Sequence, residues 1–311
     1  MTETTQLPDN TRIALREYPE ALPDAHHFEV KTQPSQAPGE GEILVAVRYI
    51  SLDAWIGTTL SPGWLHELIP LDSTVGAFGV GHVIASGDDG FEVGDAVTGV
   101  LGAQTHALVK ATDCQKIDDK KLPITAWLGL LAVTTGLTAY FGIRDIGQIK
   151  PGETVVVSAA AGAVGSVAAQ IAKLDGGRVI GIAGGPAKCK FLVDELGLDA
   201  AVDYKAGDVE GQLKAAAPDG VDVFFDNVGG EILDAVLDRI RDRARVVICG
   251  AISQYADNAN VYGPRLYLRL AERYSRMEGY TVMHFKEHFP RGLADLSAWI
   301  EQDKIWMPEQ V

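Results

Sequence analysis

The sequence contains little cysteine: Cys114, Cys189 and Cys249 are the only three in 311 residues. Because they lie far apart, they form neither a disulfide framework nor a metal-binding spacing. Basic residues are also scarce, with 27 Lys and Arg against 42 Asp and Glu and a formal net charge of −15. Binding to nucleic acid depends on clustered Lys and Arg, so this balance argues against a nucleic-acid partner.

The sequence also lacks a recognisable export signal, because its first ten residues are polar and acidic. The longest uncharged stretch, residues 124–143, has about the length of a membrane span. It contains four threonines and three glycines, so we interpret it as a buried helix of the fold and expect no membrane partner. A reduced, cytoplasmic protein is the expectation that follows.

The length of 311 residues predicts about two domains, at about 150 residues each. The first part is rich in short, glycine-punctuated strand patterns, at 42–51, at 75–85 and after the turn at 91–95. Such a pattern is typical of a small barrel or sandwich.

From about residue 126 the pattern changes to alternating strands and helices. We expect strands at 154–157, 178–183, 200–203, 221–225 and 244–249, and helices at 166–174, 187–196, 209–216 and 231–241. This alternation predicts an α/β fold with a parallel, doubly wound sheet.

A small-residue turn, residues 159–165, joins the first of these strands to the first helix. Gly162 allows the backbone to approach a pyrophosphate, and Gly165 allows the helix to pack closely on the strand. The free N–H groups at the start of the helix favour an anion. Ala160 stands where the usual fingerprint has its first glycine, so the strand-turn-helix context carries the prediction of a dinucleotide site.

The end of the second strand bears on the choice of cofactor. An NAD site usually has an acidic residue there, but residues 182–185 read Ile-Ala-Gly-Gly, and Lys188 follows. The missing carboxylate and the nearby cation favour NADP, with Lys188 on the 2′-phosphate. Alternatively, Lys188 is a solvated surface residue.

Polar or glycine residues follow three of the predicted strands, at 159–165, 226–230 and 249–255. The carboxyl ends of parallel strands meet at one edge, so these segments should line one crevice. Asn227 is a candidate for binding cofactor hydroxyls or for capping the next helix. Gly250 suits either a close backbone approach or an ordinary turn.

These segments in this order resemble the medium-chain dehydrogenase/reductase superfamily, and more closely its zinc-independent prostaglandin reductase and alkenal double-bond reductase branch. The motifs that carry the resemblance lie at 155–173, 197–205, 222–237, 248–255 and 276–283. The resemblance implies a GroES-like β-barrel domain over 1–125 and an NADP-binding Rossmann domain over 126–285. It also implies a segment over 286–311 that returns to the first domain and is shorter than in the family.

The resemblance further implies NADP(H) as cofactor, a small-molecule enone or alkenal as substrate, and a homodimer joined through the Rossmann sheet edges. Its cofactor contacts map onto Thr138, Ala161, Gly162, Ala163, Val164, Gly184, Lys188, Tyr204, Asn227, Cys249, Gly250, Ile252 and Ser253. Its substrate residues map onto Trp55 and Tyr255, although the family usually has a tyrosine at the first position.

Zinc-dependent relatives need a cysteine after the first long strand, a Gly-His-Glu ligand pair and a four-cysteine lobe. Here Asp53 stands in the first region, His82 has no Glu after it, and the lobe is missing. We therefore expect no metal and interpret His82 as a packed or surface histidine. Without a metal, reduction of an activated double bond is favoured over oxidation of simple alcohols.

The expected reaction is hydride transfer from NADPH to the β-carbon of an α,β-unsaturated ketone or aldehyde. Tyr255 would stabilise the resulting enolate by donating a hydrogen bond to its oxygen; alternatively, it is a half-buried rim residue. Two further alternatives are a quinone or other carbonyl reductase on the same scaffold and a non-catalytic NADPH-binding protein.

Overall fold

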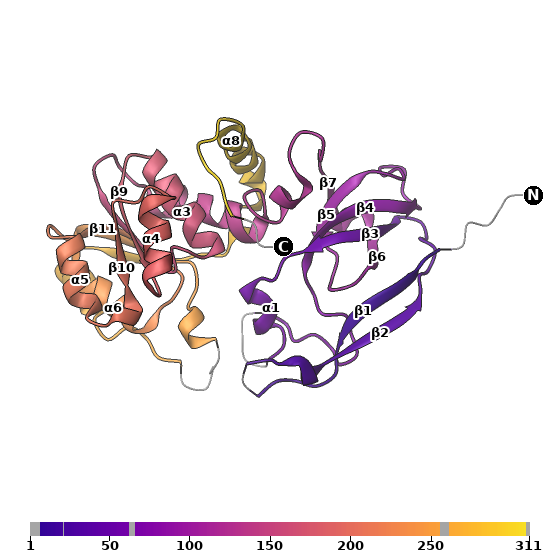
Figure 1. Cartoon of the computed structure of the whole chain (residues 1–311), viewed down its shortest axis with the longest axis horizontal. Coiled ribbons are helices and arrows are strands. Elements are labelled where there is room, and N and C mark those ends of the chain that lie inside the picture. Colours follow the sequence, from indigo (N-terminus) through magenta and orange to yellow (C-terminus); the bar gives the residue numbers. More distant parts are fainter. Residues whose placement is uncertain (1–6, 21, 62–65, 256–260, 309–311) are drawn as a thin grey trace, which may run out of the picture. The chain divides into compact units, whose positions relative to one another are not determined.

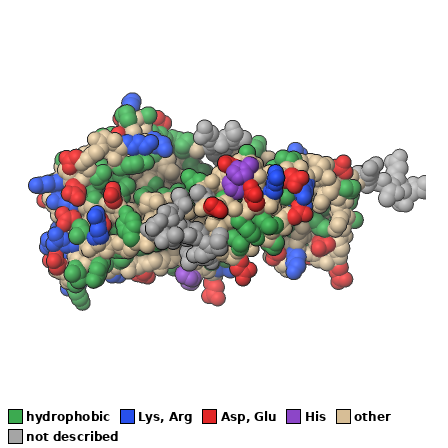
Figure 2. All heavy atoms as spheres, turned by 90° about the horizontal axis from the view of Figure 1, so that it is seen from below, with side chains coloured by type: hydrophobic (Ala, Val, Ile, Leu, Met, Phe, Trp, Pro, Cys, Tyr) green, Lys and Arg blue, Asp and Glu red, His purple; other side chains and the backbone are tan. Residues whose placement is uncertain are grey.

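The computed structural model describes residues 7–20, 22–61, 66–255 and 261–308 (Figure 1). The chain divides into two compact units, Met1–Leu128 and Gly129–Val311. On the face shown in Figure 2, Lys and Arg side chains lie among Asp and Glu side chains. No helix in the described ranges is long and apolar enough to span a membrane.

The first unit contains an antiparallel five-stranded sheet in the order β6-β3-β4-β5-β7. Its strands are β3 (Glu42–Ile50), β4 (Phe78–Ser86), β5 (Ala96–Val100), β6 (His106–Lys110) and β7 (Cys114–Lys116). A second, two-stranded sheet pairs β1 (Asp9–Leu15) with β2 (Phe28–Pro34). Alternate apolar side chains of β3, β4 and β5, among them Val45, Val83 and Val97, form the core, which gives the predicted GroES-like domain.

In the described part of this unit, the short helices η1 (Ala25–His27), α1 (Ala54–Thr58) and η2 (Ala111–Asp113) lie between these strands, and η3 (Ile124–Trp127) follows β7. The first of them is capped by Asp24, whose side chain accepts a hydrogen bond from the backbone N–H of His26. Helix α1 carries Trp55, one of the residues that the sequence points to as a substrate contact.

The second unit is built on a parallel six-stranded sheet in the order β10-β9-β8-β11-β12-β13. Its strands are β8 (Thr154–Val157), β9 (Arg178–Ala183), β10 (Ala200–Asp203), β11 (Val221–Asp226), β12 (Ile240–Ile248) and β13 (Arg276–Gly279). Numbered along this unit, that order is 3-2-1-4-5-6, the order of a Rossmann fold. The predicted doubly wound sheet is therefore confirmed.

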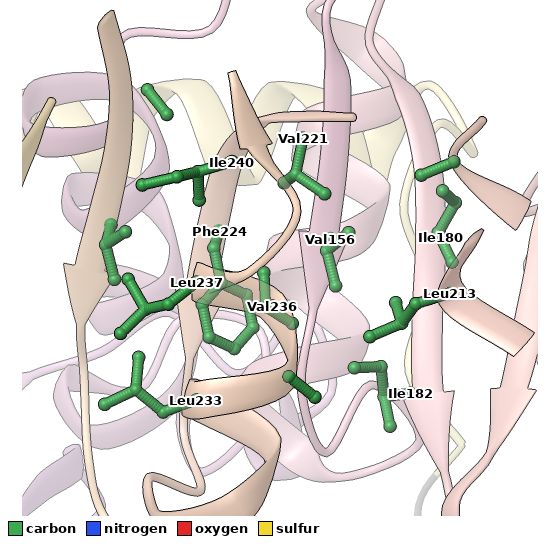
Figure 3. Close-up of a cluster of buried hydrophobic side chains, with 14 of the residues drawn as sticks. Val156, Ile180, Ile182, Leu213, Val221, Phe224, Leu233, Val236, Leu237 and Ile240 are labelled. Carbon is green, nitrogen blue, oxygen red and sulfur yellow. The ribbon is translucent and has the colours of Figure 1, made fainter. Parts of the chain in front are cut away.

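Helices α3 (Ala163–Leu174), α4 (Pro186–Asp194), α5 (Val209–Ala216) and α6 (Gly230–Leu237) connect the strands. The apolar faces of α5 and α6 pack on the sheet, and Figure 3 shows Val236 and Leu237 of α6 beside Phe224 and Leu213 of α5 beside Ile182. Because all five side chains are fully buried, this cluster fixes the helices against the strands that carry the cofactor turns.

Truncation of the ring at the centre of this cluster should destabilise the second unit strongly. We expect Phe224→Ala to lower the free energy of unfolding by about 3–5 kcal/mol, because a buried Phe leaves a large cavity. Val193→Ala is the control, since Val193 is 40% exposed. Urea denaturation followed by circular dichroism would measure both, and equal losses for the two variants would contradict the burial.

Two of the expected helices are corrected by the structure. Residues 124–143 do not form one helix: after η3 come a π-helix η4 (Val133–Leu137), α2 (Thr138–Phe141) and another π-helix η5 (Gly142–Gly147). The Thr138 hydroxyl donates to the carbonyl oxygen of Val133 at 2.8 Å, which competes with regular helical bonding.

The second correction concerns the expected helix at 231–241. Helix α6 ends at Leu237, and strand β12 begins at Ile240, which pairs with Val221 of β11. Pairing with a neighbouring strand overrides the local helical pattern, as is common for short segments.

The last part of the described chain also belongs to the second unit. It comprises η7 (Ile252–Gln254), α7 (Leu268–Glu272), β13, η9 (Val282–His288) and α8 (Phe289–Glu301). The Gln170 side chain of α3 holds Trp306 by two hydrogen bonds, of 2.8 Å to its carbonyl oxygen and 3.0 Å from its N–H. Residues after the last helix are thereby fastened to α3.

Candidate functional site

The turn between β8 and α3 presents backbone N–H groups at the carboxyl edge of the sheet. The N–H of Ala160 donates to the Ile182 carbonyl oxygen at 3.0 Å, which fixes the turn to β9. Gly162 is the exposed N-cap of α3, and no side chain caps the helix there. The first N–H groups of a helix have no partner within it, so this end suits a pyrophosphate.

Gly165 explains how closely α3 approaches this turn. A Cβ atom on Gly165 would overlap the carbonyl oxygen of Ala159, so only glycine fits without moving the helix. Gly162 is less constrained, since a Cβ there would lie 3.1 Å from the same oxygen. The two roles predicted for these glycines, helix packing for Gly165 and an open backbone for Gly162, are consistent with this geometry.

Asp226, at the end of β11, joins two of the three segments that the sequence brings to this edge. Its carboxylate accepts hydrogen bonds from the Ser158 hydroxyl at 2.8 Å and from the N–H groups of Val228 and Gly229 at 2.9 and 3.0 Å. The side chain is fully buried, and desolvation raises the pKa of Asp226 despite these donors. The sequence places Asp226 in the segment 226–230 but assigns it no role, although an acid that closes a buried strand was a usable signal.

The raised pKa of Asp226 has a definite consequence for stability. The folded protein binds this proton more tightly than the unfolded chain, so the free energy of unfolding falls as pH rises through the window between the two pKa values. Asp226→Asn removes the titration. We expect the stability of the native protein relative to this variant to decrease from about pH 4 upward, as measured by urea denaturation. A relative stability that grows with pH would contradict the assignment.

Asn227 lies beside Asp226, and its contacts bear on the two roles that the sequence leaves open. Its side-chain N–H donates to the Ser158 carbonyl oxygen at 2.7 Å. Helix α6 begins after Gly229, and no side-chain hydrogen bond caps it. Asn227 therefore binds the end of β8 and does not cap the helix.

The third segment, residues 249–255, is tied to the second by backbone hydrogen bonds. The N–H of Cys249 donates to the Asp226 carbonyl oxygen at 2.8 Å, and that of Ile252 donates to Asn227 at 3.1 Å. Ser253 donates through its N–H and its hydroxyl to the carbonyl oxygen of Val228. The structure thus brings the three predicted segments together at one edge.

Tyr255 closes this third segment. The Ala251 N–H donates to its hydroxyl oxygen at 3.3 Å, and a Cβ on Gly250 would lie 3.0 Å from the same oxygen. Gly250 therefore leaves room for the phenol, and the backbone orients it. A hydroxyl that accepts one hydrogen bond is a stronger donor to the next acceptor.

Cys249 and Thr138 meet the same edge through Tyr280. The Tyr280 hydroxyl donates to the carbonyl oxygen of Thr138 at 2.6 Å, and its N–H donates to the carbonyl oxygen of Ile248. Burial raises the pKa of Cys249 to about 12, so this thiol stays protonated at neutral pH. Thr138 is thereby held beside the ends of β12 and β13.

The turns after β9 and β10 form the remaining part of the predicted site. Gly184 lies against the Tyr204 ring, since a Cβ on Gly184 would come within 2.8 Å of three atoms of the phenol. Tyr204 opens η6 (Tyr204–Ala206) and is 45% exposed. Lys188 is also exposed, in the first turn of α4.

Trp55, in the first unit, already uses the one hydrogen bond donor of its side chain. Its indole N–H donates to the Asp53 carboxylate at 3.2 Å, and its ring packs edge-on against Phe78 with centroids 5.9 Å apart. A tyrosine at this position would present a hydroxyl, whereas the Trp55 side chain has a single N–H, which the bond to Asp53 uses.

Potential metal-ligand side chains lie at two places in the described part of the first unit. The imidazole of His82 lies 2.9 Å from the Asp119 carboxylate, and no third potential ligand joins this pair among the residues that the structure describes. Across the described ranges, groups of three potential ligands occur at one place, where Glu17, His26 and His27 approach one another in the first unit. His82 is half-buried, and its imidazole hydrogen-bonds to the Asp119 carboxylate.

These features define an NADP(H)-dependent oxidoreductase with a GroES-like and a Rossmann domain. Two family models match the chain: "Zinc-binding dehydrogenase" over residues 163–298 and "N-terminal domain of oxidoreductase" over residues 11–117. The chain belongs to the zinc-independent branch of the medium-chain dehydrogenase/reductase family.

Individual relatives share most of their length with this chain. YfmJ of Bacillus subtilis (strain 168), named as an NADP-dependent oxidoreductase, is 41% identical over 96% of this chain and 89% of its own. The NADPH-dependent curcumin reductase of Escherichia coli (strain K12) is 35% identical, over 97% and 89%. Other relatives, 34–37% identical, are named as reductases of alkenals, prostaglandins and pulegone.

A crystal structure of CurA from Vibrio vulnificus in complex with NADPH has the same fold. It superposes with a TM-score of 0.90 at 35% identity, covering 96% of this chain and 90% of that one. The cofactor fits the residues seen here: an open α3 amino end, a glycine-lined turn and exposed cationic and aromatic side chains after β9 and β10. The protein is accordingly an NADP(H)-binding oxidoreductase.

Proposed function

We propose that the protein reduces the carbon–carbon double bond of α,β-unsaturated ketones and aldehydes. The observation that carries this proposal is the Tyr255 hydroxyl, which the backbone of residues 250–251 orients at the cofactor edge of the sheet. The names of the relatives, which act on alkenals, prostaglandins, pulegone and curcumin, support the same class of substrate.

When bound, NADPH supplies a hydride from its reduced nicotinamide ring. In the proposed reaction the substrate gains that hydride at the β-carbon and a proton from water at the α-carbon, so the C=C π bond is lost and NADP⁺ is formed. Negative charge develops on the carbonyl oxygen as the enolate forms. Tyr255 donates a hydrogen bond to that oxygen, where a prepositioned donor lowers the barrier.

The cofactor contacts follow from the three segments at the sheet edge. We propose that Ala161, Gly162, Ala163 and Val164 hold the pyrophosphate through their backbone, with Thr138 close by. Gly184, Lys188 and Tyr204 would hold the 2′-phosphate, and Asn227, Cys249, Gly250, Ile252 and Ser253 the nicotinamide half. Trp55 would line the substrate site with its apolar ring, and we propose no metal ligand.

A second candidate is reduction of quinones. A quinone oxidoreductase from Pseudomonas syringae pv. tomato DC3000 shares the fold with a TM-score of 0.76 at 26% identity. The relatives named for enone-type substrates are 34–37% identical, so we favour the enone. Turnover of an enone panel and a quinone panel with NADPH and with NADH tests this, and faster turnover of quinones would overturn the proposal.

We also propose that the protein forms a homodimer through the edge of its Rossmann sheet. Strand β13 ends the sheet and is exposed along its whole length. Tyr267, Leu268 and Tyr274 near α7 are 57, 62 and 77% exposed. An unpaired strand edge with apolar neighbours favours association. A monomeric mass in analytical ultracentrifugation would contradict the dimer.

A further inference from the structure

An acidic residue stands beside the end of β9, where the sequence of that strand shows none. Strand β10 pairs with β9 in parallel, and the register places Asp203 opposite Ala183. This is close to the position at which NAD-binding Rossmann folds carry the carboxylate that holds the ribose diol. The role of Asp203 therefore bears on the choice between NADPH and NADH.

The Asp203 carboxylate is committed to the backbone. One oxygen, Oδ1, accepts hydrogen bonds from the N–H of Gly185 at 2.7 Å and from the N–H of Lys205 at 2.9 Å. The Gly185 N–H is the largest of the causes that hold the pKa of Asp203 below its usual value. Oδ1 is therefore used by the backbone, and these two bonds tie the start of the segment 203–205 to the turn at Gly185.

The backbone of Asp203 is held from the other side by Gln212 of α5. The Gln212 amide accepts the Asp203 N–H at 3.0 Å and donates to the carbonyl oxygens of Asp203 and Gly207 at 3.0 and 2.7 Å. Both ends of the segment 203–207 are thereby fixed on the second unit.

These bonds place the Tyr204 ring against Gly184. Gly185 has φ +92°, a conformation that suits glycine, and its N–H points to Asp203. The same turn leads into α4 and its first-turn Lys188. Asp203 thus connects the two elements that carry Lys188 and Tyr204.

We propose that Asp203 is a positioning residue for NADPH selectivity: it ties the turn at 184–185 to Tyr204, so that Lys188 and Tyr204 grip the adenosine 2′-phosphate together. It does not bind the ribose itself. The inference rests on the contacts proposed above for Lys188 and Tyr204, but not on the substrate of the enzyme.

The test compares two substitutions of the same side chain in the full-length protein. Asp203→Ala removes both backbone bonds, whereas Asp203→Asn keeps an Oδ1 that accepts them. We expect Asp203→Ala to raise the Kd of NADPH at least about tenfold and that of NADH less than about threefold. Asp203→Asn should stay within about threefold of the native protein for both, and nicotinamide fluorescence measures each Kd.

Gln212→Met is a second variant, since it loosens the same segment and leaves the carboxylate intact. We expect a selective loss of NADPH affinity, while thermal melts show that the variants fold. The proposal is overturned if Asp203→Ala and Gln212→Met both lower the affinities for NADPH and NADH equally. It is also overturned if Asp203→Ala and Asp203→Asn lower the affinity for NADPH equally. A larger loss for NADH would make Asp203 a ribose ligand instead.

These measurements need no substrate. If the protein fails to reduce enones but Asp203→Ala still loses NADPH selectively, only the proposed reaction fails. If the protein reduces enones but Asp203→Ala keeps the native preference for NADPH over NADH, only the proposed role of Asp203 is wrong.

Discussion

Tyr255→Phe is expected to lower kcat for a simple enone about 100-fold. The change removes the hydrogen bond donor that we place on the developing enolate oxygen, and loss of one such donor costs about 10²–10³ in rate. The Kd of NADPH should change less than about threefold, because the ring remains and the interaction forms only in the transition state. Steady-state rates of NADPH oxidation and fluorescence titration measure the two quantities.

Tyr274→Phe is the matched control for this substitution. Tyr274 is 77% exposed and packs on the Arg243 guanidinium through its ring, which the substitution preserves. Turnover of the control should equal that of the native protein. If Tyr255→Phe turns over the enone as fast as the control, Tyr255 is the rim residue of the alternative interpretation.

Lys188→Ala is expected to raise the Kd of NADPH about 10- to 100-fold and to leave that of NADH within about threefold. A charge-assisted bond from an ammonium to the 2′-phosphate has that strength, and NADH carries no phosphate there. The effect should shrink at high salt, because Lys188 is exposed and its charge is screened. Titration of both cofactors at low and high ionic strength provides the measurement.

Lys190, two residues further along α4, offers the control. It is exposed and forms an ion pair with Asp194 of the same helix, so Lys190→Ala removes an equal charge from the same element. We expect its Kd for NADPH to change less than about threefold. If Lys188→Ala lowers the affinities for NADPH and NADH equally and only slightly, Lys188 is a solvated surface lysine without a role in cofactor binding.

Much of the second unit could be predicted from the sequence, for a physical reason. Its strands are short apolar runs bounded by glycine and polar residues, and Thr154–Val157, Arg178–Ala183 and Ala200–Asp203 match the predicted bounds. In a parallel sheet both faces are buried, so such runs are distinctive. The same argument explains why three polar strand ends could be expected to meet.

Local sequence was less informative where tertiary contacts decide the structure. Residues 124–143 look like one apolar helix, but side-chain bonding to Val133 and glycine at 136 and 142 divide it into short turns. The segment from Ile240 carries a helical pattern yet pairs with β11. Neither competing interaction can be read from spacing along the chain.

In the candidate site, too, some features could be predicted from local sequence and others depend on tertiary contacts. The turn at 159–165 could be predicted because its residue types are demanding: only small residues allow α3 to approach. Asp203 and Asp226 lie in segments that the sequence singled out, but their roles could not be predicted, because Gly185 and Ser158, which bond to them, follow neighbouring strands of the sheet. Which strands are neighbours is set by the sheet order, and the sequence of any one strand does not contain it.

The most direct test of the proposed reaction follows the transferred hydride. The protein is incubated with an enone and NADPH that carries deuterium in place of both hydrogens at C4 of the nicotinamide, and the product is examined by NMR. We predict a saturated ketone with one deuterium on the former β-carbon and none on the carbonyl carbon. An allylic alcohol with deuterium on the carbon that bears the hydroxyl group would contradict the account.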